Sequence, residues 1–260
     1  MTAALSFVEA SFGYGAAEVL RGIDLSLAEG ELLAVLGANG GGKTTLVRGA
    51  TGLLAPTAGA VLVHGRPVAG RTRNELAREV AVVPQEGTPI FPFSVLETVL
   101  MGRAPWMRPF QFEGEEDLRR ARRALEQVDA LALADRDLTE LSGGERQRVI
   151  VARALAQESR ILLADEPTAH LDLKHAVRLF RLLADLASGC RLATLVVTHD
   201  VNLAAAHCDR IVLLAEGRIV ADGPPREALT PAHLERTFGT RVRVETADDG
   251  RILVVPEVAP

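Results

Sequence analysis

The sequence predicts an α/β fold in which buried strands alternate with helices and an antiparallel β layer is added to the core. Three observations lead to this prediction. An apolar run at residues 32–36 is followed by a glycine-rich segment and then by a helical run at 46–50. Further buried strands are predicted at 80–83, 161–164 and 192–198. Before the first helix, residues 5–12 and 19–27 alternate as half-buried strands do, which is more antiparallel structure than a plain doubly wound sheet contains.

Composition narrows the class of protein. The chain has 260 residues, of which 48% are hydrophobic, so it is long enough for a large core. Its net charge of −5, without a large basic block, makes nucleic acid an unexpected partner. Cys190 and Cys208 form no motif, and we expect both to be buried small hydrophobes in a reducing compartment. No signal peptide is recognisable and no apolar run approaches the roughly 20 residues of a membrane span, so we expect a cytosolic chain that could serve a membrane only as a peripheral subunit.

The segment 37–45 has the spacing of a phosphate-binding loop. It reads Gly, four residues, then Gly-Lys-Thr, and it lies between a strand and a helix. Glycines accept the positive φ that turns backbone N–H groups toward an anion, and the helix that follows adds free N–H groups. Lys43 supplies a full charge near the β- and γ-phosphates, and the Thr44 hydroxyl can ligate Mg²⁺. The alternative is a glycine-rich turn with a chance lysine, and both flanks favour nucleotide binding instead.

Residues 86–113 combine several prolines with half of the aromatic residues of the chain. Within this region, residues 94–100 are predicted to form a capped helix with Ser94 as N-cap and Glu97 closing a capping box. The aromatic residues form either a local core cluster or an exposed apolar face for a partner protein, and the residues alone favour neither. These aromatic residues are Phe91, Phe93, Trp106, Phe110 and Phe112.

Two further helices are predicted after this region. Residues 115–133 are amphipathic, and the arginines at 119, 120, 122 and 123 indicate a solvated helix face rather than an anion site. The second helix follows residues 141–148, with Ser142 as N-cap and Glu145 at capping-box spacing. Gly143 and Gly144 weaken a first turn, which makes sense if backbone N–H groups must approach a ligand closely; the alternative is simply a well-capped helix.

Polar residues follow two of the predicted strands. Asp165 and Glu166 end the strand 161–166, and their side chains are expected to alternate, so that one orients Mg²⁺ while the other handles a water. Two acids at a strand end are common, and only the preceding phosphate loop gives them weight. His199 ends the strand 192–198, at the edge of a parallel sheet where α/β sites lie. Hairpins are predicted at 211–220 and at 242–254.

Taken in order, these motifs resemble the nucleotide-binding subunit of an ATP-binding cassette (ABC) transporter over roughly residues 5–225. Residues 37–45 are similar to the Walker A loop, Gln85 to the Q-loop, 141–145 to the signature, 161–166 to Walker B with its catalytic glutamate, and His199 to the switch histidine. Leu171 and Asp172 match the end of the D-loop, and Tyr14 stands where the family has an adenine-stacking aromatic. The chain departs from the usual pattern at Ala38, Gly41, Ala169 and His170.

The resemblance implies a single ABC ATPase domain with a P-loop, RecA-like core. Residues 1–86 and 159–225 are expected to form this core with its antiparallel β subdomain, 87–158 an inserted helical subdomain that carries the signature, and 226–260 a C-terminal extension. It also implies a head-to-tail homodimer that closes on ATP and Mg²⁺ and opens after hydrolysis. The implied catalytic residues are Glu166, His199 and Gln85, and the implied metal-associated residues are Thr44, Gln85 and Asp165. The implied ATP contacts are Tyr14, Gly37, Asn39, Gly40, Gly41, Gly42, Lys43, Thr44, Thr45, Ser142, Gly143 and Gly144.

Residues 91–103 and 166–172 resemble the importer branch for haem, iron-siderophores or cobalamin. The implied function is ATP hydrolysis that drives transmembrane permease subunits, with a substrate-binding protein, at the cytoplasmic face of the inner membrane. The alternative is a soluble ABC ATPase, for example in iron–sulfur assembly. A nucleotide-binding regulator without turnover is disfavoured by the presence of Glu166 and His199.

Overall fold

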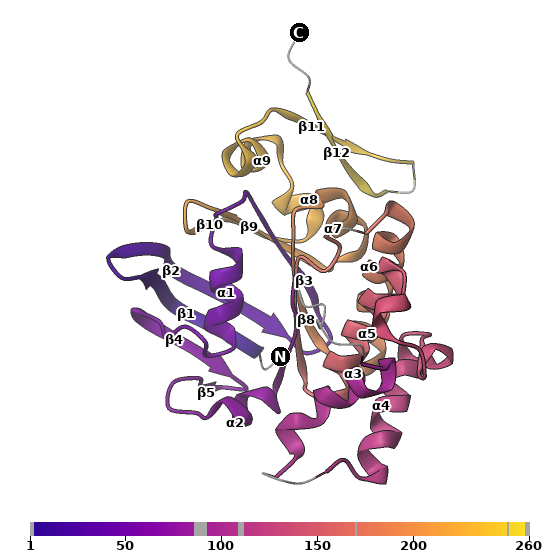
Figure 1. Ribbon diagram of the computed structural model, residues 1–260. Helices are drawn as coiled ribbons and strands as arrows, with labels where there is room; N and C mark the ends of the chain where they lie inside the picture. Colours follow the sequence, from indigo (N-terminus) through magenta and orange to yellow (C-terminus); the bar gives the residue numbers. More distant parts are fainter. Residues whose placement is uncertain (1–2, 86–92, 109–111, 170, 249, 258–260) are drawn as a thin grey trace.

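A six-stranded sheet forms the centre of the molecule (Figure 1). The computed structural model describes residues 3–85, 93–108, 112–169, 171–248 and 250–257. The strand order is β10-β9-β3-β8-β7-β6, and all neighbours are parallel except the β9–β10 hairpin. Its strands are β3 (Leu32–Gly37), β6 (Val80–Val83), β7 (Ile161–Asp165), β8 (Ala193–Thr198), β9 (Arg210–Ala215) and β10 (Arg218–Gly223). The predicted α/β fold is therefore confirmed.

An antiparallel sheet stands beside this core, as the alternating N-terminal residues predict. It contains β1 (Ala3–Tyr14), β2 (Ala17–Ala28), β4 (Ala58–Val63) and β5 (Arg66–Pro67). Helix α1 (Lys43–Ala50) lies between the two sheets (Figure 1). Side chains of β3 contribute to the cores on both faces of the central sheet, because successive residues of a strand point to opposite faces. Leu33 and Val35 lie in the core shared with the antiparallel sheet, and Leu32, Ala34 and Leu36 lie in the core under the helices.

Helices cover the opposite face of the central sheet and form a separate layer. They are α3 (Val95–Leu100), α4 (Glu115–Gln127), α5 (Gly143–Ala156) and α6 (Leu173–Cys190), with a 3₁₀ helix at Met101–Trp106. The predicted capping boxes of α3 and α5 are both present. The prediction of one helix over 115–133 is wrong at its end: α4 stops at Gln127, Asp129 turns the chain with a φ of 53°, and a 3₁₀ helix follows at Leu131–Leu133.

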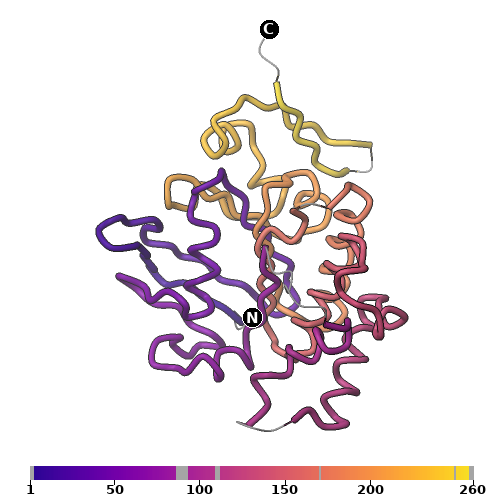
Figure 2. Tube along the Cα trace, in the orientation of Figure 1, coloured from indigo at the N-terminus to yellow at the C-terminus, as the bar shows by residue number. Residues whose placement is uncertain are grey.

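The C-terminal segment closes one end of the molecule, where the hairpin of β11 (Val242–Thr246) and β12 (Ile252–Pro256) packs over the short helix α7 (Val201–His207) (Figure 2). Helices α8 (Pro225–Ala228) and α9 (Pro231–Phe238) connect it to β10, and α2 (Arg73–Ala77) precedes β6. Among the described residues, no helix is both long and apolar enough to cross a bilayer.

Two smaller expectations need correction. Cys208 is buried, as expected, but Cys190, the last residue of α6, is exposed. The predicted N-terminal strand ending at residue 12 is too short, because β1 continues through Tyr14 and pairs with Ala17 before the chain turns.

Candidate nucleotide-binding site

Four neighbouring parallel strands end at the same edge of the central sheet. Since β6, β7, β8 and β3 are adjacent and parallel, their carboxyl ends deliver the segments that carry Gln85, Asp165 with Glu166, His199 and the phosphate loop to one place. A cavity of about 310 Å³ lies there. Its lining residues are Tyr14, Val19, Asn39, Gly40, Gly42, Lys43, Thr44, Thr45, Gln85 and Glu166. The structure thus brings most of the predicted core-side site residues together.

The loop after β3 has the backbone that an anion site needs. Gly40 and Gly42 have φ values of 79° and 99°, which side chains other than glycine rarely adopt. At Gly42 a Cβ would also come within 2.4 Å of the Leu20 side chain. Gly42 is the N-cap of α1 and no side chain caps this helix, so N–H groups of the first turn remain available to a ligand.

Lys43 places a buried positive charge in this loop. Lys43 is 6% exposed, and its ammonium group donates to the carbonyls of Gly37 at 2.9 Å and Ala38 at 3.1 Å. The ammonium also lies 3.7 Å from a carboxylate oxygen of Glu166. The positive charge of this buried ammonium suits it to bind the phosphate oxygens of a nucleotide.

Glu166 lies at the centre of the charged groups. It is buried, and its second carboxylate oxygen is 2.6 Å from Nδ1 of His199, whose side chain is 62% exposed. Because a carboxylate can only accept, Nδ1 carries the proton of this hydrogen bond. We expected the Asp165 and Glu166 side chains to point apart because residues alternate along a strand, but β7 ends at Asp165. Glu166 instead adopts a strained conformation with a φ of 49°, and its N–H donates to the Val197 carbonyl.

Asp165 has the environment of a cation ligand. Burial raises the pKa of Asp165, and a hydrogen bond with the Thr44 side chain opposes that shift. One of its carboxylate oxygens, Oδ1, is buried and has no hydrogen-bond partner among the described residues. Oxygen ligands of this kind suit Mg²⁺, and Gln85 adds an exposed carboxamide at the cavity. The residues present therefore fit a hard divalent cation, although no cluster of three or more His, Cys, Asp or Glu side chains suited to a metal occurs in the described part of the chain.

Tyr14 forms the rim of the cavity. Its side chain is 44% exposed, and its hydroxyl accepts a hydrogen bond from Arg48 at 3.0 Å. Hydrogen bonds with Thr45 and Arg48 hold the pKa of Tyr14 below its ordinary value. Neither Arg48 nor Val19, which also lines the cavity, was anticipated as part of the site. The strand alternation that places Val19 in β2 gives no signal of its position beside the loop.

The signature segment lies apart from this cavity. Ser142 and Gly143 are exposed at the start of α5 and do not line the cavity of their own chain. Gly144 is buried against the His175 ring, which would lie within 2.1 Å of a Cβ at this position. His175 is in turn held by Asp172 at 2.7 Å. The departure at His170 lies outside the described residues.

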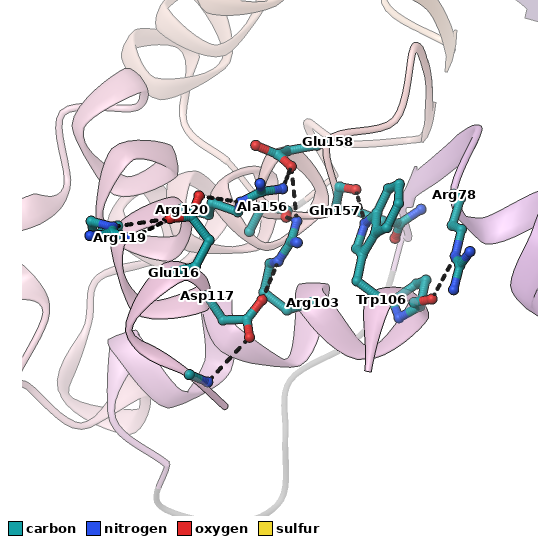
Figure 3. Close-up of polar contacts among 12 residues, drawn as sticks. Arg78, Arg103, Trp106, Glu116, Asp117, Arg119, Arg120, Ala156, Gln157 and Glu158 are labelled. Carbon is teal, nitrogen blue, oxygen red and sulfur yellow. Dashed lines mark hydrogen bonds and ion pairs between the residues drawn. The ribbon is translucent and has the colours of Figure 1, made fainter. Parts of the chain in front are cut away.

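None of the aromatic residues that the structure describes between residues 86 and 113 is fully buried, and Phe93 is partly buried. Phe112 is 88% exposed, and Phe91 and Phe110 lie outside the described residues. Trp106 is 39% exposed, donates its indole N–H to the Gln157 carbonyl at 2.8 Å, and lies between the guanidinium groups of Arg78 and Arg103 (Figure 3). Trp106 therefore joins the Met101–Trp106 helix to the residues that directly follow α5 and α2.

Comparisons with known proteins agree with this geometry. A family profile described as ABC transporter matches residues 20–169. The hemin import ATP-binding protein HmuV of Burkholderia ambifaria is 44% identical over 92% of this chain and 94% of its own length. The cobalamin import ATP-binding protein BtuD of Halobacterium salinarum is 42% identical over 92% of this chain, which spans 60% of the length of that relative.

Solved structures resemble the whole chain. A chain from an inward-facing ABC transporter assigned to the metal-chelate type has a TM-score of 0.87 and 32% identity, covering 99% of this chain and 98% of its own. The dimeric post-hydrolysis structure of the ATP-binding cassette MJ0796 with ADP and Pi has a TM-score of 0.74 and 29% identity, covering 85% and 99%. The phosphate loop, the acidic pair after β7 and these similarities lead to one conclusion: the chain belongs to the ABC transporter family, as one of its ATPase cassettes.

Proposed function

We propose that this chain is the ATP-hydrolysing subunit of a membrane importer for haem, an iron-siderophore or cobalamin. The observation that carries the ATPase part is that the buried Glu166 carboxylate lies between the Lys43 ammonium and the His199 imidazole. The importer part rests on similarity to the HmuV and BtuD import proteins and to the metal-chelate transporter chain. The relatives give no support to the alternative of a soluble cassette.

The proposed chemistry is the attack of water on the γ-phosphorus of ATP. The bond from this phosphorus to the β-phosphate oxygen breaks, ADP leaves with the bonding electrons, and the proton of the water passes to a Glu166 oxygen. Lys43 and the N–H groups of residues 40–45 bind the phosphates, and Tyr14 contacts the adenine. His199 holds Glu166 through Nδ1 and so keeps a carboxylate oxygen directed to the water.

We assign the metal-associated positions to Thr44, Asp165 and Gln85. The unpartnered, buried Oδ1 of Asp165 supports this assignment, because such an oxygen is open to a cation. Burial raises the pKa of Asp165, and a cation bound there would favour the ionised carboxylate. Mg²⁺ held by these residues would neutralise charge on the phosphate oxygens of ATP. Without it, Asp165 and the phosphates would repel one another.

A head-to-tail homodimer completes the proposed site. Ser142 and Gly143, exposed at the start of α5, do not line the cavity of their own chain. A second copy can present them to the γ-phosphate, with the N–H groups of the helix N-terminus as donors to the anion. The dimeric MJ0796 cassette supports this arrangement. Residues 1–86 with 159–225 would then move against 87–158 during closure and opening.

The proposed docking site for the permease is a groove of about 370 Å³ between α2, β6 and the Met101–Trp106 helix. Leu53 and Met101, two large apolar residues on its wall, are 62% and 41% exposed. Exposed apolar side chains along a groove are typical of a protein contact. The chain would act there as a peripheral subunit at the cytoplasmic face of the membrane, with a substrate-binding protein on the far side.

The first test measures phosphate release by the purified chain. Glu166→Gln is expected to lower kcat about 100-fold or more while ATP still binds, because a positioned general base contributes on the order of 10²–10⁴. Glu216→Gln is the matched control, since Glu216 is an exposed acid with a similar φ of 51° and does not line the cavity. Unchanged turnover in Glu166→Gln would overturn the catalytic assignment.

The second test addresses the partner. The tagged chain is purified from detergent-solubilised native membranes, and co-purifying proteins are identified by mass spectrometry. A stoichiometric polytopic membrane protein is expected, and Leu53→Asp with Met101→Asp should release it without lowering basal hydrolysis. Recovery with soluble partners alone would refute the importer proposal and leave the ATPase intact.

A further inference from the structure

The C-terminal hairpin is fastened to the helix that follows His199. Helix α7 begins directly after Asp200, whose side chain caps it by accepting from the Leu203 N–H at 3.1 Å. The hairpin strand β12 packs along this helix, and Figure 2 shows the two segments together at the end of the molecule. The hairpin also contacts α9, and Arg226 of α8 donates to its Gly250 carbonyl, but α7 is the contacted element that begins two residues after His199.

One side chain makes the connection. The Asn202 amide donates to the Val254 carbonyl at 3.2 Å, and the Val254 N–H donates to the Asn202 carboxamide oxygen at 2.8 Å. Val254 pairs with Val244 across the hairpin and presents its N–H and C=O to Asn202 on the other side. Asn202 therefore occupies the place of a third strand at this point. The contact is well protected, because Val254 and Ile252 are buried with Leu203 and Ala204 in the same core cluster.

Asn202 lies only three residues after His199. This is less than one helical turn, and the intervening backbone is held by the cap of α7 and by the Asp200 N–H bond to the Thr198 hydroxyl. His199 itself is mostly exposed, and its described polar contact is with Glu166. The position of the imidazole is thus set by the strand β8 on one side and by α7 on the other.

We propose that the C-terminal hairpin is a positioning device for the switch histidine: Asn202, bound to the backbone of Val254, holds α7 so that His199 Nδ1 stays on Glu166. Asn202 is a positioning residue, since it does not line the nucleotide cavity and acts through α7. The proposal rests on the proposed ATP hydrolysis and assigns a role to the extension 226–260. Movement of the hairpin by a partner would then change the hydrolysis rate without changing the nucleotide pocket.

The test compares kcat and KM for ATP in three single variants. Asn202→Ala removes both hydrogen bonds and is expected to lower kcat roughly tenfold with KM within about twofold, because small misplacements of a catalytic group cost one to two orders of magnitude in rate. Asn202→Asp keeps the acceptor of the 2.8 Å bond and should fall between Asn202→Ala and the parent chain. It also carries the test if Asn202→Ala does not fold. Arg226→Ala is the control, because Arg226 binds the hairpin at Gly250 from α8 and not from α7.

A double variant separates positioning from mere stability. In single-turnover measurements with excess enzyme, Asn202→Ala should slow hydrolysis in the parent chain but cause no further loss in the His199→Ala background. The same fold-loss in both backgrounds, or an unchanged kcat in Asn202→Ala and Asn202→Asp, would overturn the proposal. Normal hydrolysis by His199→Ala would instead refute the proposed role of the histidine, so the two failures are distinguishable.

Discussion

Arg103 offers the most direct test of how the segments of the helical layer are held together. Its side chain is only 3% exposed, and its guanidinium donates to Asp117 at 3.0 Å, to the Ala156 carbonyl at 2.7 Å and to Glu158 at 3.2 Å. These partners come from α4 and from the end of α5, so one residue joins three segments (Figure 3). The hydrogen bond to Arg103 opposes the desolvation of Asp117 and, with its backbone bond to Gly114, holds the pKa of Asp117 below its ordinary value.

We predict that Arg103→Met lowers the free energy of unfolding by about 3 kcal/mol. Removing one member of a buried ion pair costs roughly 3–5 kcal/mol, and the low end applies because Glu158 is 43% exposed. The methionine keeps the length of the side chain but leaves the Ala156 carbonyl without its donor. At about 2–4 °C per kcal/mol for a chain of this size, the expected fall in Tm is roughly 6–12 °C.

The measurement is thermal unfolding followed by circular dichroism. Arg119→Met is the control, since Arg119 pairs with Glu116 on the exposed face of α4, where such pairs contribute about 0–1 kcal/mol. Asp117→Asn should cost less than Arg103→Met, because the amide can still accept from the guanidinium. A Tm within about 2 °C of the parent chain for Arg103→Met would refute the argument that this buried arginine holds these three segments together.

Two further predictions concern titratable groups. Burial, together with Arg181 and Arg251, lowers the pKa of His207, which stacks on Phe180, so the native state favours the neutral imidazole. Stability should therefore fall as the pH drops below the unfolded value of about 6.5, and His207→Phe should show a smaller loss of Tm between pH 7.5 and 5.5; an equal loss would contradict this. Burial also raises the pKa of the Cys208 thiol, whereas Cys190 is exposed, so a maleimide should label one cysteine in the native chain and two in urea. Native labelling at Cys208 would be inconsistent with its burial.

Local chemistry explains what could be predicted without coordinates. The phosphate loop is defined by glycine spacing between a strand and a helix, and the capping boxes at Ser94 and Ser142 by side chains three residues apart. Such signals depend on a few neighbouring residues. The sequence did not predict the end of α4, because the amphipathic pattern continues beyond Gln127. The turn depends on the positive φ of Asp129, which no local residue pattern indicates.

The family, the α/β class and the identity of the phosphate loop follow from the sequence alone, because each depends on short-range periodicity and spacing that survive without a folded context. Only the tertiary structure decides which groups meet. Lys43, Glu166 and His199 are far apart in the chain and lie within hydrogen-bond or ion-pair distance because β3, β7 and β8 are neighbours in one sheet. The same holds for Asn202 and Val254, 52 residues apart, and for Arg103 and Glu158, 55 apart. These contacts depend on strand order and helix packing, which no local pattern encodes.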